Sequence, residues 1–386
     1  MRLCVLVSTY PRVSETFVYE PIRWLGERGL EVEVLAKRAG SLPEGDDAHF
    51  VAPRVLSPVR EVRAALRAPG RVLARLLRVR HLRVAARSLL PEIARADALL
   101  AHFGKIGARW LPVAAAARRP YAVFFHGNDT TGELRALPRR YDALFRSGAA
   151  LIANCEFLAA RLEAAGAPRR SIAVIPNGVD DALAKGPPAG LDSHTVLTVG
   201  RLIEKKGIAT SLAAFARARG SLPDWRYEIV GDGALRDVLE AAAVEVGAAD
   251  AVRFRGFLPR ARTLDAIRGA SMLVLASATA ASGDAEGTPN CVIEAASCGV
   301  PVVATRCGGI PELLPPAAAA RGFLVPENDA AALARAIAEL GASEARRREW
   351  GDACRAHIRK RHSADAHVAA LVSALERVAR VPVVSL

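Results

Sequence analysis

The chain has 386 residues, 51% of them apolar and 24% charged, so it can bury a large core, and global disorder is excluded. This length exceeds one ordinary core and predicts two domains of roughly 150–200 residues each. Residues 1–178 hold almost all of the formal net charge of +13, with 28 Lys and Arg against 16 Asp and Glu.

This basic half has two interpretations. It faces something negative, such as a phosphorylated acceptor or a membrane surface, or it reflects a composition in which Arg outnumbers Lys 47 to 6. Nucleic acid is disfavoured, because no aromatic stacking platform accompanies the charge.

Three features favour a cytoplasmic location. The first seven residues predict a buried strand and not a signal peptide. No apolar run reaches the ~18 residues of a membrane-spanning helix. The six cysteines are scattered and form no C-x-x-C pair, which is typical of reduced, buried thiols.

In the first half of the chain, short apolar runs alternate with helical patterns. Helices are predicted at 16–28 and 157–165. Strands are predicted at 3–7, 32–36, 98–101, 122–125, 150–153 and 172–175. The stretch 54–95 carries eleven arginines among regularly spaced apolar residues. It is either a basic amphipathic helix that lies on an anionic membrane or a solvated helix that covers its own domain.

Turn and linker residues mark a join at 176–190, and the second half repeats the alternation. Its strands are predicted at 196–199, 227–230, 252–254, 272–276, 302–304 and 323–325. Continuous apolar runs indicate parallel strands buried on both faces, and their alternation with helices indicates doubly wound α/β sheets.

We therefore expect two Rossmann-like domains, with ligands beyond the carboxyl ends of the strands and an active site in the cleft between the domains. The predicted boundaries are an N-terminal domain at 1–178, a linker at 179–193, a C-terminal domain at 194–360, and a C-terminal helix at 361–386 that packs back on the N-terminal domain.

Two cations follow the first strand of the second half. Arg201 and Lys206 lie between Gly200, which follows the strand, and a helix predicted to begin near Gly207. At that carboxyl end, the planar Arg fork and the mobile Lys charge suit a diphosphate. The alternative is a surface turn with two solvated cations.

A second glycine turn follows the next strand. Gly231, Asp232 and Gly233 precede a helix predicted at 234–246. This turn lets the backbone approach a ligand closely, although no complete G-x-G-x-x-G follows. We expect it to contact the same ligand as Arg201 and Lys206.

The segment 286–305 is the most informative. Pro289 suits a first helical position, and the helix is predicted to end at Gly299. The start of this helix favours a diphosphate. Glu294, one turn in, suits two ribose hydroxyls, and Glu286 in the preceding loop suits hydroxyls of the sugar. The predicted phosphate-binding backbone is that of Thr288, Pro289, Asn290 and Cys291. The alternative is a Glu that merely favours the helix dipole and an unrelated exposed Glu.

These residues resemble a known family. Glu286 and Glu294 are similar to the E-x7-E pair of the retaining glycosyltransferases of family 4, which have the GT-B fold. Arg201 and Lys206 match the cations with which that family neutralises the donor diphosphate. The resemblance extends to turns at 175–180 and 308–312. It implies an α/β GT-B fold with two Rossmann-like domains facing across a cleft, and C-terminal helices. It also implies that the N-terminal domain binds the acceptor and that the C-terminal domain binds the nucleotide sugar.

The first half carries two further resemblances. His126 is similar to the family's histidine on the acceptor side, which borders the reacting sugar. After the first strand, many members have a Gly-Gly loop, whereas Ser14, Glu15, Thr16 and Phe17 here resemble the S-E-T-F motif of exopolysaccharide-type enzymes. Ser14, Glu15 and Thr16 are therefore candidates for a loop that contacts acceptor or donor. Helix capping by Ser14 is the alternative.

The resemblance implies a retaining transferase that moves a sugar from a nucleotide-diphosphate donor, with a UDP-sugar favoured. His126, Arg201, Lys206 and Glu286 are the catalytic candidates. We expect no cofactor and no metal, because the cations neutralise the diphosphate, and we interpret Asp284 beside Glu286 as a fortuitous D-x-E. The expected acceptor is a glycan, a lipid-linked intermediate or a small molecule, with peripheral contact to the inner membrane face left open.

Several alternatives remain. One is a natural-product glycosyltransferase with a soluble aglycone, such as an antibiotic core. Another is a GT-B protein that binds nucleotide sugar but has lost activity. A phosphorylase or sugar-phosphate synthase of the same fold differs mainly in acceptor. An NAD(P)-dependent oxidoreductase is disfavoured, because the first βα turn contains no glycine.

Overall fold

The computed structural model describes residues 1–12, 15–41, 51–55, 91–184, 186, 188 and 190–379. The chain divides into unit 1, which comprises residues 1–175 and 367–386, and unit 2, which comprises residues 176–366. Ser14 and residues 56–90 of the basic stretch lie outside the described residues, so the predictions made for them are not tested.

Unit 1 contains a seven-stranded parallel sheet in the order β3-β2-β1-β4-β5-β6-β7. The strands are β1 (Arg2–Tyr10), β2 (Glu31–Ala39), β3 (Arg54–Val55), β4 (Ala98–His102), β5 (Tyr121–Phe125), β6 (Ala150–Ala153) and β7 (Ile172–Val174). The six predicted strands are confirmed. The edge strand β3 was not predicted, because its two exposed residues carry no apolar run.

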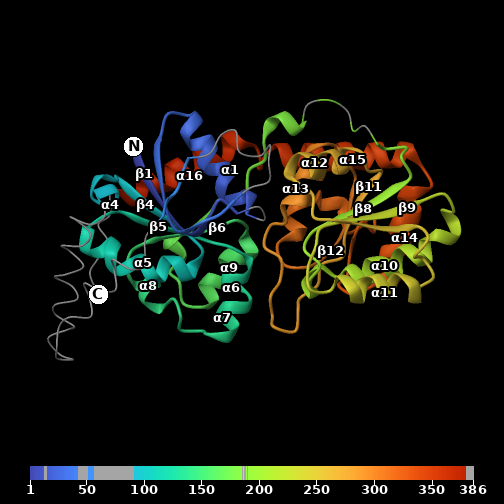
Figure 1. The fold of residues 1–386 in the computed structure, drawn as a ribbon, viewed down its shortest axis with the longest axis horizontal. Coiled ribbons are helices and arrows are strands. Elements are labelled where there is room, and N and C mark those ends of the chain that lie inside the picture. The colour runs from blue at the N-terminus through green and yellow to red at the C-terminus, as the bar shows by residue number, and fades with distance from the viewer. Residues whose placement is uncertain are drawn as a thin grey trace. The chain divides into compact units, whose positions relative to one another are not determined.

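Helices cover both faces of this sheet. Figure 1 shows α1 (Thr16–Glu27) and α16 (Ala364–Ala379) on one face, with α5 (Gly104–Ala117), α8 (Asp142–Arg146) and α9 (Glu156–Ala164) on the other. Trp24 of α1 contacts His367 of α16, with ring centroids 6.1 Å apart. The remaining described helices are α4 (Pro91–Arg95), α6 (Gly127–Thr130) and α7 (Gly132–Ala136).

Unit 2 contains a six-stranded parallel sheet in the order β10-β9-β8-β11-β12-β13. The strands are β8 (Thr195–Val199), β9 (Arg226–Val230), β10 (Val252–Gly256), β11 (Met272–Leu275), β12 (Val302–Thr305) and β13 (Leu324–Val325). All six were predicted, although β10 has no fully buried residue.

The helices of unit 2 also form two layers. Figure 1 shows α12 (Arg260–Arg268), α13 (Asn290–Ser297) and α15 (Glu344–Arg359) on one face, and α10 (Ile208–Ala218), α11 (Arg236–Glu245) and α14 (Ala330–Gly341) on the other. The doubly wound α/β prediction is therefore confirmed for each unit. No helix among the described residues is long and apolar enough to cross a membrane.

Strand order locates the edges at which ligands bind. In both sheets the order reverses beside the first strand, between β1 and β4 in unit 1 and between β8 and β11 in unit 2. At such a switch point, the loops that leave the two strands diverge to opposite faces and leave a crevice at the carboxyl ends. The predicted site residues are therefore expected at these two edges.

Candidate functional site

The carboxyl edge of the unit 2 sheet gathers the residues predicted to bind a donor. The loop after β8 leads into a short 3-10 helix, η3 (Glu204–Lys206), and the loop after β11 spans 276–289. Lys206 and Glu286 come from these two loops, and they meet in an ion pair. The sheet thus brings together residues that are 80 positions apart in the sequence.

The Lys206–Glu286 pair is nearly sealed from solvent. Lys206 Nζ lies 2.6 Å from Glu286 Oε1, and their side chains are only 11% and 7% exposed. Ser277 Oγ donates a second hydrogen bond to Glu286 Oε1 over 3.1 Å. Burial of two charges costs free energy that a close, hydrogen-bonded partner must offset. The arrangement keeps a full positive and a full negative charge at one point of the sheet edge.

The pKa values of the pair show that both groups are charged. Burial opposes ionisation of Glu286, but attraction to Lys206 and Lys205, with hydrogen bonds from Lys206 and Ser277, outweighs it and lowers the carboxyl pKa. Burial likewise opposes the Lys206 ammonium, and attraction to Glu286 more than offsets this and raises the amine pKa. At neutral pH, Lys206 is therefore an ammonium and Glu286 a carboxylate.

A second lysine–carboxylate pair lies beside the first, and the sequence analysis did not predict it. Lys205 Nζ lies 3.0 Å from Asp284 Oδ2, with side-chain exposures of 7% and 19%. The two acids of the D-x-E sequence therefore each face a lysine. The sequence shows two adjacent lysines here. In an irregular turn, however, the sequence does not reveal the direction in which each side chain points.

Arg201 is exposed, unlike Lys206. Its positive charge lowers the pKa of Lys206 in opposition to Glu286, so the two cations share one electrostatic environment. Gly200 leaves room for this arrangement, since a Cβ on Gly200 would come within 3.2 Å of Lys206 Cε. The predicted cations are thus both near the carboxyl end of β8.

Two glycine turns support the edge. Gly231 has φ +132°, and a Cβ there would overlap the Gly200 carbonyl oxygen, so only glycine fits. Asp232 holds this turn by accepting on its carbonyl from Leu202 N over 3.0 Å and on Oδ1 from Gly233 N over 2.8 Å. The backbones after β8 and β9 therefore pack directly against each other.

The helix α13 starts beside the Glu286 loop. Pro289 is its N-cap and Asn290 its first residue, so the prediction that Pro289 occupies the first helical position is wrong by one residue. A proline at the N-cap, with ψ 115°, ends the extended loop while its carbonyl still accepts from Val292 N. Asn290 Oδ1 accepts from Asn177 Nδ2 over 2.9 Å, which ties the helix start to the predicted 175–180 turn.

Cys291 is a buried thiol in the first turn of α13. Burial raises its pKa to about 12, although the nearby Lys206 charge acts in the opposite direction. It is therefore protonated at neutral pH and is no nucleophile. The thiol therefore carries no charge toward a ligand, and the predicted role of the Cys291 backbone stays a prediction.

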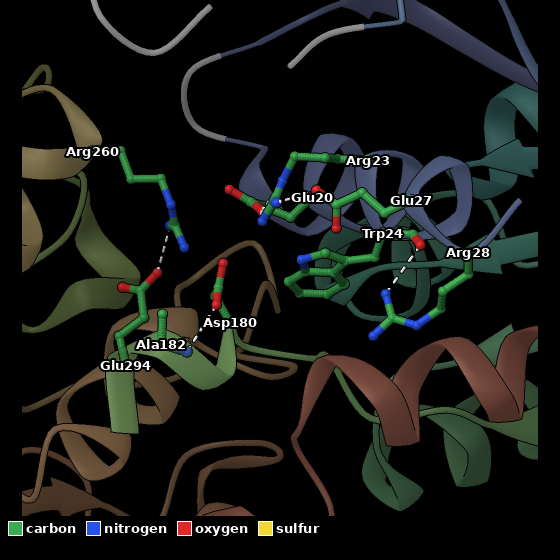
Figure 2. A network of polar contacts seen from close by, with 9 residues as sticks. All are labelled: Glu20, Arg23, Trp24, Glu27, Arg28, Asp180, Ala182, Arg260 and Glu294. Carbon is green, nitrogen blue, oxygen red and sulfur yellow. Dashed lines mark hydrogen bonds and ion pairs between the residues drawn. The ribbon is translucent and has the colours of Figure 1, made fainter. Parts of the chain in front are cut away.

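Glu294 lies one turn into α13 and is 7% exposed. Its Oε1 accepts a hydrogen bond from Arg260 Nη1 over 2.8 Å (Figure 2). Arg260 is the first residue of α12, which follows β10 on the same sheet. Arg260 was not predicted as a site residue. Its position just beyond the end of a third strand could have marked it. The sequence does not show how the preceding loop folds, so it does not show which acid Arg260 faces.

In unit 1, His126 lies just after β5 and is 6% exposed. Aromatic rings enclose it: Phe124 stacks on it with centroids 4.9 Å apart, and Phe17 and Phe103 contact it at 4.5 and 4.7 Å. Phe17 belongs to the predicted S-E-T-F motif. The motif thus meets the candidate histidine within one unit, which the sequence analysis did not foresee.

A second histidine partners His126. His102 ends β4, and its Nδ1 lies 3.2 Å from His126 Nε2. Burial, together with His367, lowers the pKa of His102 to about 3. Burial, together with His102, holds the pKa of His126 well below its usual value. Both rings are therefore neutral at pH 7, and one donates a hydrogen bond to the other.

Phe103 holds its ring against His126 through an unusual backbone. Its φ is +75°, in a region that non-glycine residues rarely adopt. Such strain persists where the surrounding structure fixes it, and it clusters at functional sites. His102 and Phe103 were both missed from the sequence, although the position directly after a buried parallel strand could have marked them.

The other predicted loop residues take helical positions. Glu15 is the N-cap of α1 without a side-chain capping bond, and its Oε1 lies 3.0 Å from Arg12 Nη1. Thr16 is the first residue of α1.

Comparisons with known proteins agree with this geometry. Residues 181–357 match the glycosyl transferases group 1, and residues 14–183 match Glycosyltransferase Family 4. WcaL of Escherichia coli K12, named for colanic acid biosynthesis, is 32% identical over 374 residues, covering 88% of this chain and 90% of its own. AmsK of Erwinia amylovora, named for amylovoran biosynthesis, is 29% identical over 380 residues, covering 89% and 92%.

Solved structures show the same fold. HepE of Anabaena, in complex with UDP-glucose, has a TM-score of 0.76 at 20% identity, with 97% of this chain and 99% of that one covered. Sucrose-phosphate synthase of Thermosynechococcus elongatus has a TM-score of 0.71 at 20% identity, covering 98% and 99%. The GT-B prediction is confirmed, and the sequence similarity along the chain shows that this protein belongs to glycosyltransferase family 4.

Proposed function

We propose that the protein is a retaining glycosyltransferase that uses a nucleotide-diphosphate sugar, with UDP the favoured nucleotide, in the synthesis of an exopolysaccharide. The buried Lys206–Glu286 pair beside the start of α13 carries this proposal. The names of WcaL and AmsK support the polysaccharide, and the complexes of HepE with UDP and UDP-glucose support the nucleotide.

Each residue has a separate part in donor binding. Lys206 and Arg201 supply positive charge for the diphosphate, together with the first turn of α13. Glu286, which Lys206 and Ser277 hold in place, accepts hydrogen bonds from hydroxyls of the sugar. Glu294 accepts from the ribose. These groups are already placed before the reaction, which is what stabilisation of a transition state requires.

In the proposed reaction, the acceptor oxygen forms a bond to the anomeric carbon on the face from which the diphosphate leaves. The bond from that carbon to the phosphate oxygen breaks through an oxocarbenium-like state. The departing oxygen takes the acceptor proton, so no carboxylate nucleophile is needed. Lys206 and Arg201 stabilise the charge that grows on the diphosphate.

Two further assignments complete the proposal. His126, a neutral imidazole held by His102, takes part in transfer. No metal is required, because Asp284 and Glu286 are each engaged by a lysine and the diphosphate charge is met by side chains. The acceptor is a hydroxyl of a lipid-linked glycan intermediate, reached at the inner face of the membrane.

A donor screen tests the proposal. Purified protein is heated with UDP-, GDP- and ADP-sugars, and the donor that raises the melting temperature is then incubated with candidate acceptors for mass spectrometry. We expect Glu294→Ala to cut turnover at least ~100-fold, because it removes hydrogen bonds to a buried charge. Glu245→Ala, on the exposed end of α11, is the matched control. Wild-type turnover by Glu294→Ala would reject the donor site.

A further inference from the structure

Arg260 is a charged residue at the candidate donor site that the proposed mechanism leaves without a task. It is the first residue of α12, and Figure 2 shows its guanidinium extended toward Glu294 of α13. The Nη1–Oε1 distance is 2.8 Å, and the two side chains are 18% and 9% exposed. A pair this close and this buried fixes the orientation of both groups.

The pair occupies only part of the Glu294 carboxylate. The hydrogen bond from Arg260 falls on Oε1, and Oε2 accepts none from the part of the chain that the structure describes. A carboxylate has about four acceptor positions on its two oxygens. Glu294 therefore retains capacity for a ligand while Arg260 holds it.

Without Arg260, the Glu294 side chain would have three rotatable bonds and no partner to set them. When a ribose hydroxyl donates a hydrogen bond to a mobile carboxylate, part of the binding free energy is lost in ordering that carboxylate. A contact that already holds the carboxylate in place removes this cost. We propose that Arg260 is a positioning residue: it holds Oε1 of Glu294 so that Oε2 meets the ribose hydroxyls of the donor. This inference rests on the proposed function, because it requires a ribose at Glu294.

The opposite reading is that Arg260 blocks the site and that donor binding displaces it. The two hypotheses predict opposite changes in ribonucleotide affinity when Arg260 is removed. If Arg260 positions Glu294, its removal weakens binding of a ribonucleotide. If Arg260 competes with ribose, its removal strengthens that binding.

The test compares a nucleotide with its counterpart that lacks the ribose hydroxyls. The probe is whichever of UDP, GDP and ADP binds the full chain most tightly, and its 2′,3′-dideoxy form. Calorimetry gives both affinities for wild type, Arg260→Met and Arg260→Lys. Arg262→Met is the matched control, because Arg262 is an exposed cation on the same turn of α12. Thermal melting confirms that each variant is folded.

We expect wild type and Arg262→Met to prefer the ribonucleotide at least ~10-fold, as hydrogen bonds to a charged group do. Arg260→Met should lose most of this preference, with its affinity for the dideoxy form unchanged, and Arg260→Lys should recover part of it. In turnover assays, Arg260→Met should raise KM for the donor with kcat nearly constant, because the contact acts on binding in ground and transition states alike.

Three results would overturn the inference: a preference unchanged in Arg260→Met, a tighter binding of the ribonucleotide by that variant, or equal losses for both nucleotides. The proposed function fails in a different way. If Glu294→Ala binds and turns over donor like wild type, or if none of the three nucleotides binds, there is no ribose at Glu294, and both proposals are rejected.

Discussion

Replacement of Lys206 by Met is the perturbation that most clearly separates folding from catalysis. Met fills a similar volume but removes the charge that faces Glu286 across 2.6 Å. The Glu286 side chain left behind is 7% exposed. Removal of one partner from a buried ion pair costs about 3–5 kcal/mol of stability, because the other charge stays buried without compensation.

The predicted pH dependence follows from the pKa values. In wild type, the lowered pKa of Glu286 adds stability above the unfolded value of 4.5, and this is lost as pH falls through the folded pKa. The raised pKa of Lys206 adds stability below 10.5, which is lost as pH rises through its folded pKa. Between these limits, the contribution of the pair is constant.

Without Lys206, burial loses its strongest opponent, because only Lys205 and Ser277 still favour ionisation, and the carboxyl pKa of Glu286 should rise from its wild-type value. An ionised Glu286 then destabilises the folded state, and protonation relieves this. The stability deficit of Lys206→Met should therefore shrink as pH falls from about 7 to about 5, while wild type shows no matching gain from this pair.

The assay is chemical denaturation at both pH values for wild type, Lys206→Met, the double variant Lys206→Met with Glu286→Gln, and the exposed control Lys360→Met. The double variant should regain most of the lost stability, because no charge remains buried, yet transfer should stay at least ~100-fold below wild type. A deficit below ~1 kcal/mol, or one equal at both pH values, would refute the reasoning about the pair.

Three further predictions concern other parts of the molecule. His126→Ala should impair sugar transfer while nucleotide affinity, measured by calorimetry, stays within a few-fold of wild type; parallel loss of both would remove His126 from the transfer step. Gly231→Ala should lose more than ~2 kcal/mol of stability and most nucleotide binding, because its Cβ overlaps the Gly200 carbonyl, whereas Gly247→Ala, with open space around it, should lose about 1 kcal/mol and bind normally. Turnover should be unchanged by EDTA, and its abolition with rescue by Mg²⁺ would reject the metal-free mechanism.

The sequence predicted the architecture well because parallel strands carry a strong signal. Twelve short apolar runs became twelve strands, and their alternation with helices predicted the doubly wound sheets. The two-residue strand β3 was not predicted because it lies at an exposed edge of the sheet. The shift of the helix start from Pro289 to Asn290 has a simple cause: proline fits either terminal position, and only the backbone angles decide between them.

The sequence singled out candidate side chains but not the ion pairs that they form. Lys206, Glu286 and Glu294 each stood out because they follow strand ends or open a helix. That Lys206 faces Glu286 and Arg260 faces Glu294 depends on how three loops of different length fold back on one edge. The same holds in unit 1, where His102 and the strained Phe103 surround His126 from strands that are adjacent in space and separated in sequence.

Amide hydrogen exchange of the full chain, with and without the tightest-binding nucleoside diphosphate, tests the central claim most directly, because it needs no acceptor. The claim is that unit 2 holds the donor between the loops after β8, β9 and β11. We predict slower exchange in 199–207, 230–236 and 286–296 when the nucleotide is bound, and loss of this protection in Glu294→Ala. Unchanged exchange in these three segments, despite measurable binding, would contradict it.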